Sequence, residues 1–364
     1  MNIDDLLKER CLPSVLSKRR GGKINTPSAF ELQRERIIKL ITLEAYGALP
    51  QAPEHMTVKT DTVDLTFAAG KAKKTAMSLH FELSGKSFSF PAISVIPKQK
   101  GPHPAFIVMG FDKCIPNEHL PAEEIIDRGY AILYFDANGV AKNLDDKFKG
   151  ACAPFLSVSR RLKSAPGKLM MWAWGAMRLM DHAAAIDDID TERTAVIGHG
   201  ILGKAALIAG ALDSRFNFTV ANGSGTLGAA LTRKSRGMSA EEACEMYPYL
   251  FSKNLTKSLS LGKKMPFDQH FLLSLIAPRH LLVGSAIGDL WSDYADEFLA
   301  LCATNEVYGL YGKQGLVHGG ALPSDSTRLH GGSIGYHLRC GSSYLSREDW
   351  NIYMDYIDGK RKAL

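Results

Sequence analysis

Closely spaced cysteines are missing from this chain of 364 residues. None of its cysteines forms a CxxC pair, the spacing typical of zinc sites and redox motifs, and no disulfide framework is suggested. We therefore expect no metal and no cofactor. We interpret the cysteines as reduced thiols, mostly buried, at Cys11, Cys114, Cys152, Cys244, Cys302 and Cys340.

Long apolar runs are also missing. No stretch reaches the roughly 18 apolar residues that a membrane span needs. The first eight residues, which run from acidic to basic, lack the apolar segment of a signal peptide. These absences exclude an integral membrane protein, and we expect a cytoplasmic protein with no membrane partner.

Strong charge asymmetry is lacking too. The formal net charge of +6 could favour anionic ligands such as uronic acids. However, the densest basic runs, residues 18–20 and 360–362, lie towards the chain ends, where solvated tails are common. No nucleic-acid motif accompanies them, so we expect no nucleic-acid partner. The sequence leaves the oligomeric state open.

Hydrophobic patterning predicts an α/β protein, with 45% hydrophobic and 23% charged residues as in ordinary globular chains. Residues 1–50 are expected to form an N-terminal helical extension, and residues 51–364 a single domain. Alternating stretches between residues 56 and 100 indicate antiparallel strands. After them, buried strands alternate with helices, which is typical of a doubly wound, mostly parallel sheet. The expected buried strands are 105–109, 130–135, 195–197 and 280–284, and the expected buried helix is 169–180.

The segment 194–207 has the pattern of a nucleophile elbow, in which a strand reverses through a glycine-rich turn into a helix. In the G-x-S-x-G form of this turn, the central serine is the nucleophile of an esterase. Gly198 fits the first glycine, and Gly203 comes one position later than in the simplest pattern. Gly200 occupies the central position, so the turn lacks its serine.

Six further motifs follow the elbow in order. Together with the elbow they resemble the glucuronoyl esterase family and its acetyl-xylan-esterase-like bacterial relatives, over roughly residues 100 to 357. The resemblance implies an α/β-hydrolase fold whose serine attacks an ester of a carbohydrate uronate, helped by a histidine base and a carboxylate. The motifs are LDSRF at 212–216, SGTLGAA at 224–230, PFDQH at 266–270, IAPR at 276–279, DLWSD at 289–293 and GYHLR at 335–339.

When the family's catalytic positions are aligned with this sequence, most of them lack the catalytic residue. The family's serine falls on Gly200, and the arginine after it, which helps to hold the oxyanion, falls on Ile201. The family's histidine falls on Ser343. The family's carboxylate falls on Gly223 in some members and on Asp289 in others, so only Asp289 keeps a catalytic group. An equal alternative is that the Asp289 carboxylate caps the following helix.

Four residues near the elbow are candidate ligand contacts. Lys204 resembles the family's substrate-side lysine, although an exposed helix lysine is nearly as good an interpretation. Trp291 could stack on a sugar ring or anchor a lid. His199 could act as a base, but packing or capping of the turn is the commoner role. Ile201 still offers its backbone N–H to a partial oxyanion hole.

Other polar side chains have simpler structural interpretations than a displaced catalytic role. His337 falls on an expected strand at a structural family position, Cys114 reads as a buried thiol, and His318 and His330 lie in glycine-rich loops. Our leading hypothesis is a pseudoenzyme that has lost serine-esterase chemistry and keeps a sugar or small-ligand cleft. The alternatives are an active carboxylic-ester hydrolase that uses displaced groups and a scaffold or regulatory protein.

Overall fold

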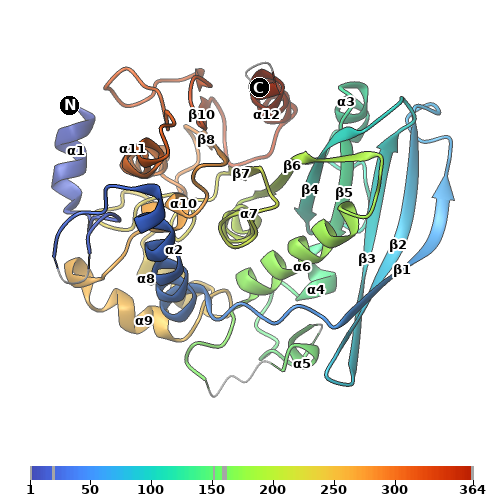
Figure 1. Ribbon diagram of the computed structural model, residues 1–364, viewed down its shortest axis with the longest axis horizontal. Coiled ribbons are helices and arrows are strands. Elements are labelled where there is room, and N and C mark those ends of the chain that lie inside the picture. Colours follow the sequence, from blue (N-terminus) through green and yellow to red (C-terminus); the bar gives the residue numbers. More distant parts are fainter. Residues whose placement is uncertain (1, 19–20, 151, 158–161, 362–364) are drawn as a thin grey trace.

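One large mixed sheet forms the centre of the protein (Figure 1). The computed structural model describes residues 2–18, 21–150, 152–157 and 162–361. Within them, ten strands form one sheet in the order β1-β2-β3-β5-β4-β6-β7-β8-β10-β9.

Six neighbouring strands of this sheet run parallel, from β5 to β10 in the sheet order. Their residues are almost entirely buried because helices cover both faces, as the continuous apolar runs predicted. The doubly wound, mostly parallel sheet is confirmed. The strands are β4 (His103–Gly110), β5 (Ala131–Asp136), β6 (Ile189–His199), β7 (Phe218–Asn222), β8 (His280–Ala286) and β10 (Ile334–Arg339).

The antiparallel strands lie at the two edges of the sheet. On one edge, β1 (His55–Asp64), β2 (Ala72–Leu83) and β3 (Lys86–Pro97) form a meander that joins the parallel part through β5. On the other edge, the short β9 (Thr327–Leu329) pairs with β10. The predicted antiparallel strands near the N-terminus are therefore present, and β1 is the outermost of them.

Helices cover the sheet on both faces and enclose two apolar cores. The larger core includes side chains of α6 (Lys168–Ala183), α7 (Ile201–Leu212), α10 (His270–Ser274) and α11 (Tyr294–Leu310). The smaller core lies under α3 (Ala122–Asp127) and α12 (Arg347–Arg361), which Figure 1 shows on the opposite side of the sheet from α6 and α7. The predicted buried helix at 169–180 is α6.

The N-terminal fifty residues contain the predicted helix. In α2 (Pro27–Ile41), Pro27 stands in the first turn, and the Ala29 N–H donates to Thr26 Oγ1 at 3.3 Å. It is preceded by α1 (Ile3–Arg10) and continues into the π-helical turn η1 (Thr42–Tyr46). The remaining short helices are α4 (Ala137–Val140), α5 (Cys152–Phe155), α8 (Ala240–Met246), α9 (Asn254–Leu259) and η2 (Gly262–Lys264).

The cysteines are less buried than predicted. All six are free thiols, but only Cys152 and Cys302 are buried, whereas Cys11, Cys114 and Cys340 are exposed. The expectation of mostly buried thiols is wrong because the exposed ones stand in connections, such as the C-cap of α1 for Cys11, rather than on core faces.

In the described part of the chain, no helix combines the length and the apolarity that crossing a bilayer requires. Of the two basic runs near the ends of the chain, Arg19, Arg20 and Lys362 lie outside the described residues.

Candidate active site

The elbow predicted from the sequence lies between β6 and α7, at the carboxyl end of the central strands. The turn is tight enough to require small residues on both sides. A methyl group on Gly198 would lie 2.2 Å from the Leu202 carbonyl oxygen, and one on Gly203 would lie 3.1 Å from the Gly198 oxygen. The glycines therefore let α7 pass close to the strand, as in a nucleophile elbow.

Gly200 adopts a backbone conformation that strongly favours glycine, with φ 58° and ψ −121°. Its N–H donates to the Asn222 carbonyl oxygen at 2.9 Å, which fixes the turn against β7. Apart from its chain neighbours, no described atom lies within 4 Å of the position that a side chain would take. The position that the sequence predicts for the nucleophile therefore faces open space, and glycine gives it no side chain.

A cavity of about 180 Å³ lies beside the elbow. Six of the seven residues predicted for the site line it: Gly200, Ile201, Lys204, Asp289, Trp291 and Ser343. The remaining wall is largely apolar, with side chains from α8 and from the segments just before and after it. Those side chains belong to Met238, Ala243, Tyr247, Leu250 and Phe251.

Asp289 follows β8 and holds the next turn together. One carboxylate oxygen accepts the backbone N–H groups of Trp291 and Ser292 at 3.1 and 3.2 Å, and the other accepts the Ser292 hydroxyl at 2.8 Å. The N-cap of α11 is a different residue, Asp293. Asp289 therefore supports the turn before the helix and also borders the cavity.

Gly223 has no side chain, and three of the residues predicted for the site border the gap that this leaves. A methyl group on Gly223 would lie 3.2 Å from Asp289 Oδ2 and 3.5 Å from both Ser343 Oγ and His199 Cε1. These side chains come from three separate strand ends, after β8, after β10 and at the end of β6. The fold therefore brings together the residues that the sequence placed in one site.

His199 faces this gap from the strand side of the elbow. Its Nδ1 forms a 2.8 Å hydrogen bond with Asn222 Oδ1, and Asn222 Nδ2 donates to the buried Tyr353 hydroxyl at 2.8 Å. Burial lowers the pKa of His199. Sequence reasoning missed Asn222 and Tyr353; the strand-end position of Asn222 was the one available signal.

Lys204 is buried and forms part of the cavity floor. Its ammonium donates to the carbonyl oxygens of Ser224 and of Thr226, the latter at 2.7 Å. Burial lowers its pKa to about 8. The interpretation as an exposed helix lysine is wrong, because α7 turns this side chain towards the loop after β7 rather than towards solvent.

Glu297 lies behind the same loop, although the sequence gave no reason to select it. It accepts the Gly225 N–H at 2.8 Å and the hydroxyls of Ser224 and Ser285 at 3.2 and 2.5 Å. Burial raises its pKa to about 7. The loop after β7 is thus hydrogen-bonded to two buried side chains, the lysine Lys204 and the acid Glu297.

Trp291 lies at the edge of the cavity with 60% of its surface exposed. An exposed ring of this kind can stack on the apolar face of a sugar. Ile201, the first residue of α7, presents an apolar side chain where the family pattern has arginine, and its backbone N–H stands at the helix N-terminus.

The other candidate side chains lie elsewhere. His337, buried on β10, bonds Asp349 at 2.6 Å. His318 packs against Phe298, and His330 packs against Tyr356. Cys114 is exposed rather than buried. Among the described residues that line the elbow cavity, none of these four appears.

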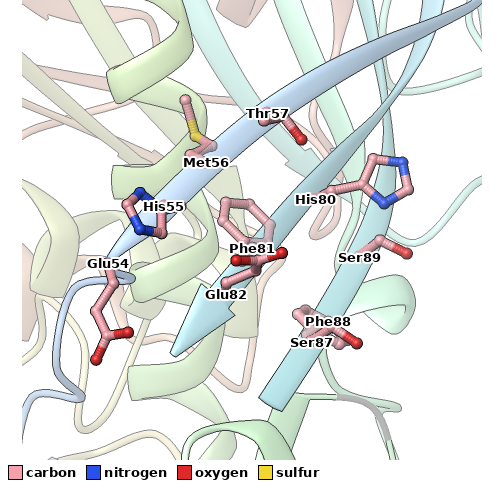
Figure 2. A pocket seen from close by; sticks show the side chains of 10 residues that line it. All are labelled: Glu54, His55, Met56, Thr57, His80, Phe81, Glu82, Ser87, Phe88 and Ser89. Atoms are coloured by element: carbon pink, nitrogen blue, oxygen red, sulfur yellow. The ribbon is translucent and has the colours of Figure 1, made fainter. Parts of the chain in front are cut away.

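A larger hollow, of about 860 Å³, lies on the antiparallel strands at the far edge of the sheet (Figure 2). Residues 54–57, 80–82 and 87–89 line it, and the histidines at its two sides, His55 and His80, lie apart across the strands. Nowhere in the described chain are three or more His, Cys, Asp or Glu side chains grouped to hold a metal ion. Because no elbow residue lines this hollow, the smaller cavity is the candidate site.

Comparisons with known proteins show what this chain is similar to. The family model for glucuronyl esterase of fungi matches residues 79–312, which include the elbow. A carbohydrate esterase from an unknown prokaryotic organism is 33% identical over 65% of this chain and 55% of its own length. A 4-O-methyl-glucuronoyl methylesterase from Podospora anserina is 29% identical over 74% of this chain and 54% of its own. The chain thus matches about half the length of these two curated relatives.

The fold also matches a solved structure over nearly the whole chain. A glucuronoyl esterase from Solibacter usitatus superimposes with a TM-score of 0.87 and 27% sequence identity. The match covers 95% of this chain and 97% of that one.

Proposed function

The chain belongs to the glucuronyl esterase family, and from that premise we propose that it binds a carbohydrate uronate ester without hydrolysing it by the family's serine mechanism. The observation that carries the proposal is the glycine at position 200. It stands in a fully built elbow with open space above it, so no hydroxyl is held there to attack an ester carbonyl.

The cavity beside the elbow supports ligand binding. Trp291 offers an exposed aromatic face at the rim, and the apolar walls suit the C–H face of a sugar or the alcohol part of an ester. The N–H of Ile201 at the start of α7 can donate to an ester carbonyl oxygen. One relative is a 4-O-methyl-glucuronoyl methylesterase, which favours a uronate ester as the ligand.

Hydrolysis by displaced groups has less support. In the described part of the chain, no serine or cysteine side chain is hydrogen-bonded to a histidine ring, which is the contact that activates a nucleophile. Loss of triad members leaves a serine hydrolase with only a residual rate, roughly 10³–10⁴ over water, from the oxyanion hole and binding. A scaffold that uses only the surface of the fold would need no such cavity.

The test combines a hydrolysis assay with a binding assay. With methyl glucuronate and aryl acetate esters we expect no turnover that depends on the cavity, and with methyl glucuronate we expect a melting temperature that rises with ligand concentration. At 100 times Kd, the stabilisation would be about 2.7 kcal/mol.

Two outcomes would contradict the proposal in different ways. Turnover that disappears in Asp289→Asn would support an active hydrolase instead. Unchanged melting temperatures across a broad panel of sugars and uronates would favour the scaffold.

A further inference from the structure

The gap at Gly223 is bordered by three polar side chains, here called the acceptor triangle: His199, Asp289 and Ser343. All three lie within 3.5 Å of the position that a methyl group on Gly223 would occupy. Within the described part of the chain, Ser343 Oγ makes no hydrogen bond, and the Nε2 atom of His199 makes none either. Ser343 Oγ and His199 Nε2 therefore have unused hydrogen-bonding capacity. Asp289 and Ser343 line the elbow cavity, and the Cε1 edge of the His199 ring borders it at Gly223.

The imidazole of His199 keeps a free hydrogen-bond acceptor. Asn222 Oδ1 can only accept, so the His199 Nδ1 atom must carry the proton of their 2.8 Å hydrogen bond. The other end of the same amide is also used, because Asn222 Nδ2 donates to the Tyr353 hydroxyl at 2.8 Å. With the proton on Nδ1, the lone pair of the neutral ring is on Nε2.

Burial keeps the His199 ring neutral. It is the largest effect and lowers the pKa of His199, and the neighbouring ring of His119, 6.0 Å away between centroids, acts in the same direction. The hydrogen bond with Asn222 and the carboxylates of Asp289 and Asp349 act in the opposite direction, but the net shift of the pKa is downwards. At pH 7 the Nε2 atom is thus an acceptor rather than a donor.

Among the described residues that line the cavity, no lysine or arginine is available to pair with the Asp289 carboxylate. Lys204 is the one lysine or arginine among the described residues that line the cavity, and its ammonium already donates to two carbonyl oxygens. A ligand carboxylate placed against Asp289 and a neutral imidazole would lose its hydration and meet a like charge. A hydroxyl group, by contrast, can donate to either acceptor.

We propose that the acceptor triangle binds a hydroxyl group of an uncharged sugar, so that the cavity accepts uronate esters and neutral glycosides and excludes the free uronate. The inference rests on the proposed function, because both place the ligand in the elbow cavity. It adds a selectivity that the proposed function does not require.

The experiment measures the affinity of the full chain for three probes at pH 7.5 by calorimetry: methyl glucuronate, methyl glucoside and sodium glucuronate. We expect the two uncharged probes to bind at least tenfold more tightly than glucuronate. If glucuronate binds as tightly as its methyl ester, the inference is overturned while the proposed function stands. If none of the three binds, both are overturned.

The variant Asn222→Asp tests the role of the imidazole. A carboxylate beside Nδ1 favours the imidazolium ion, which turns Nε2 into a donor. We expect at least a fivefold loss of preference for the ester over glucuronate. A nuclear magnetic resonance titration of the His199 ring should show a raised pKa.

The matched control is Asn351→Asp, which adds the same charge at an exposed position of α12 and should leave the preference unchanged. If Asn222→Asp does not fold, His199→Phe keeps a ring but removes the acceptor. We expect His199→Phe to bind the ester about tenfold more weakly, equivalent to 1.4 kcal/mol. Unchanged selectivity in a folded Asn222→Asp, or unchanged ester affinity in His199→Phe, would refute the inference.

Discussion

Glycine at position 200 relieves a strain that any other residue would add to the elbow. With φ 58° and ψ −121°, the backbone lies in a region that costs a residue with a Cβ on the order of 1–3 kcal/mol. An enzyme tolerates that cost because the strained turn presents its nucleophile. In a protein that only binds its ligand, stability favours glycine.

We therefore predict that Gly200→Ala lowers the free energy of unfolding by about 1–3 kcal/mol, measured by urea denaturation. The cost is purely one of backbone conformation, because a methyl group at this position would meet open space.

The control for this prediction is Gly309→Ala. Gly309 also faces open space, but it lies in α11 without a positive φ, and alanine there should stabilise the protein by roughly 0.5–1 kcal/mol. Equal effects of the two substitutions would show that the elbow holds no strain.

At the scale of elements, the N-terminal helix α1 packs on the domain through two apolar side chains, Ile3 and Leu6, and one buried charged side chain, Arg10. Arg10 Nη2 lies 2.5 Å from Asp296 Oδ1 at the start of α11, and Arg10 Nη1 donates to the Arg233 carbonyl oxygen at 3.0 Å. Both ionic side chains are almost fully buried. Breaking such a pair on one side leaves an uncompensated charge in the interior.

We expect Arg10→Ala to destabilise the protein by about 3–5 kcal/mol, measured by chemical denaturation, and to detach α1. Faster protease cleavage within residues 3–10 would report the detachment. Lys8→Ala is the matched control, since Lys8 pairs with Asp5 at the surface of the same helix and should cost no more than about 0.5 kcal/mol. A loss in Arg10→Ala as small as in Lys8→Ala would mean that α1 is held by its apolar contacts.

The secondary structure elements were predictable because each has a strong local signal. Apolar runs such as 105–109 and the Thr26-Pro27 start of α2 identify their elements without reference to the rest of the chain. The elbow was predictable for the same reason, since its glycines are close in sequence. That six predicted residues line one cavity also followed from motifs whose order the fold preserves.

The hydrogen-bond partners at the site were not predictable in the same way. The contact between His199 and Asn222 exists because β6 and β7 are neighbours in a register that pairs these two residues, and no local pattern states that register. Glu297 is on α11, more than 70 residues from the loop that it supports. Such contacts depend on the assembled sheet rather than on any segment of it.

At the scale of the whole molecule, buried ionisable groups make stability depend on pH. Burial raises the pKa of Glu297 from an ordinary 4.5 to about 7, and that of Asp296 from 3.8 to about 7. Between the ordinary and raised values, the folded chain binds more protons than the unfolded chain, so stability falls as pH rises. Lys204 acts in the window from about 8 to 10.5, where its lowered pKa makes stability rise with pH.

We predict that Glu297→Gln becomes more stable relative to the wild type as the pH rises from 5 to 7, because Glu297 by itself contributes a decline in this window. The glutamine cannot ionise, so the variant lacks the loss of stability that ionisation of Glu297 causes in the wild type. Asp296 contributes its own loss of stability in both proteins. Urea denaturation at half-unit pH steps measures both curves. Glu9→Gln, which removes a surface charge from α1, should give a curve parallel to the wild type. If Glu297→Gln is also parallel, then Glu297 is ionised in the folded protein throughout the window, and the Lys204 ammonium on the other side of the loop stabilises its charge more than burial opposes it.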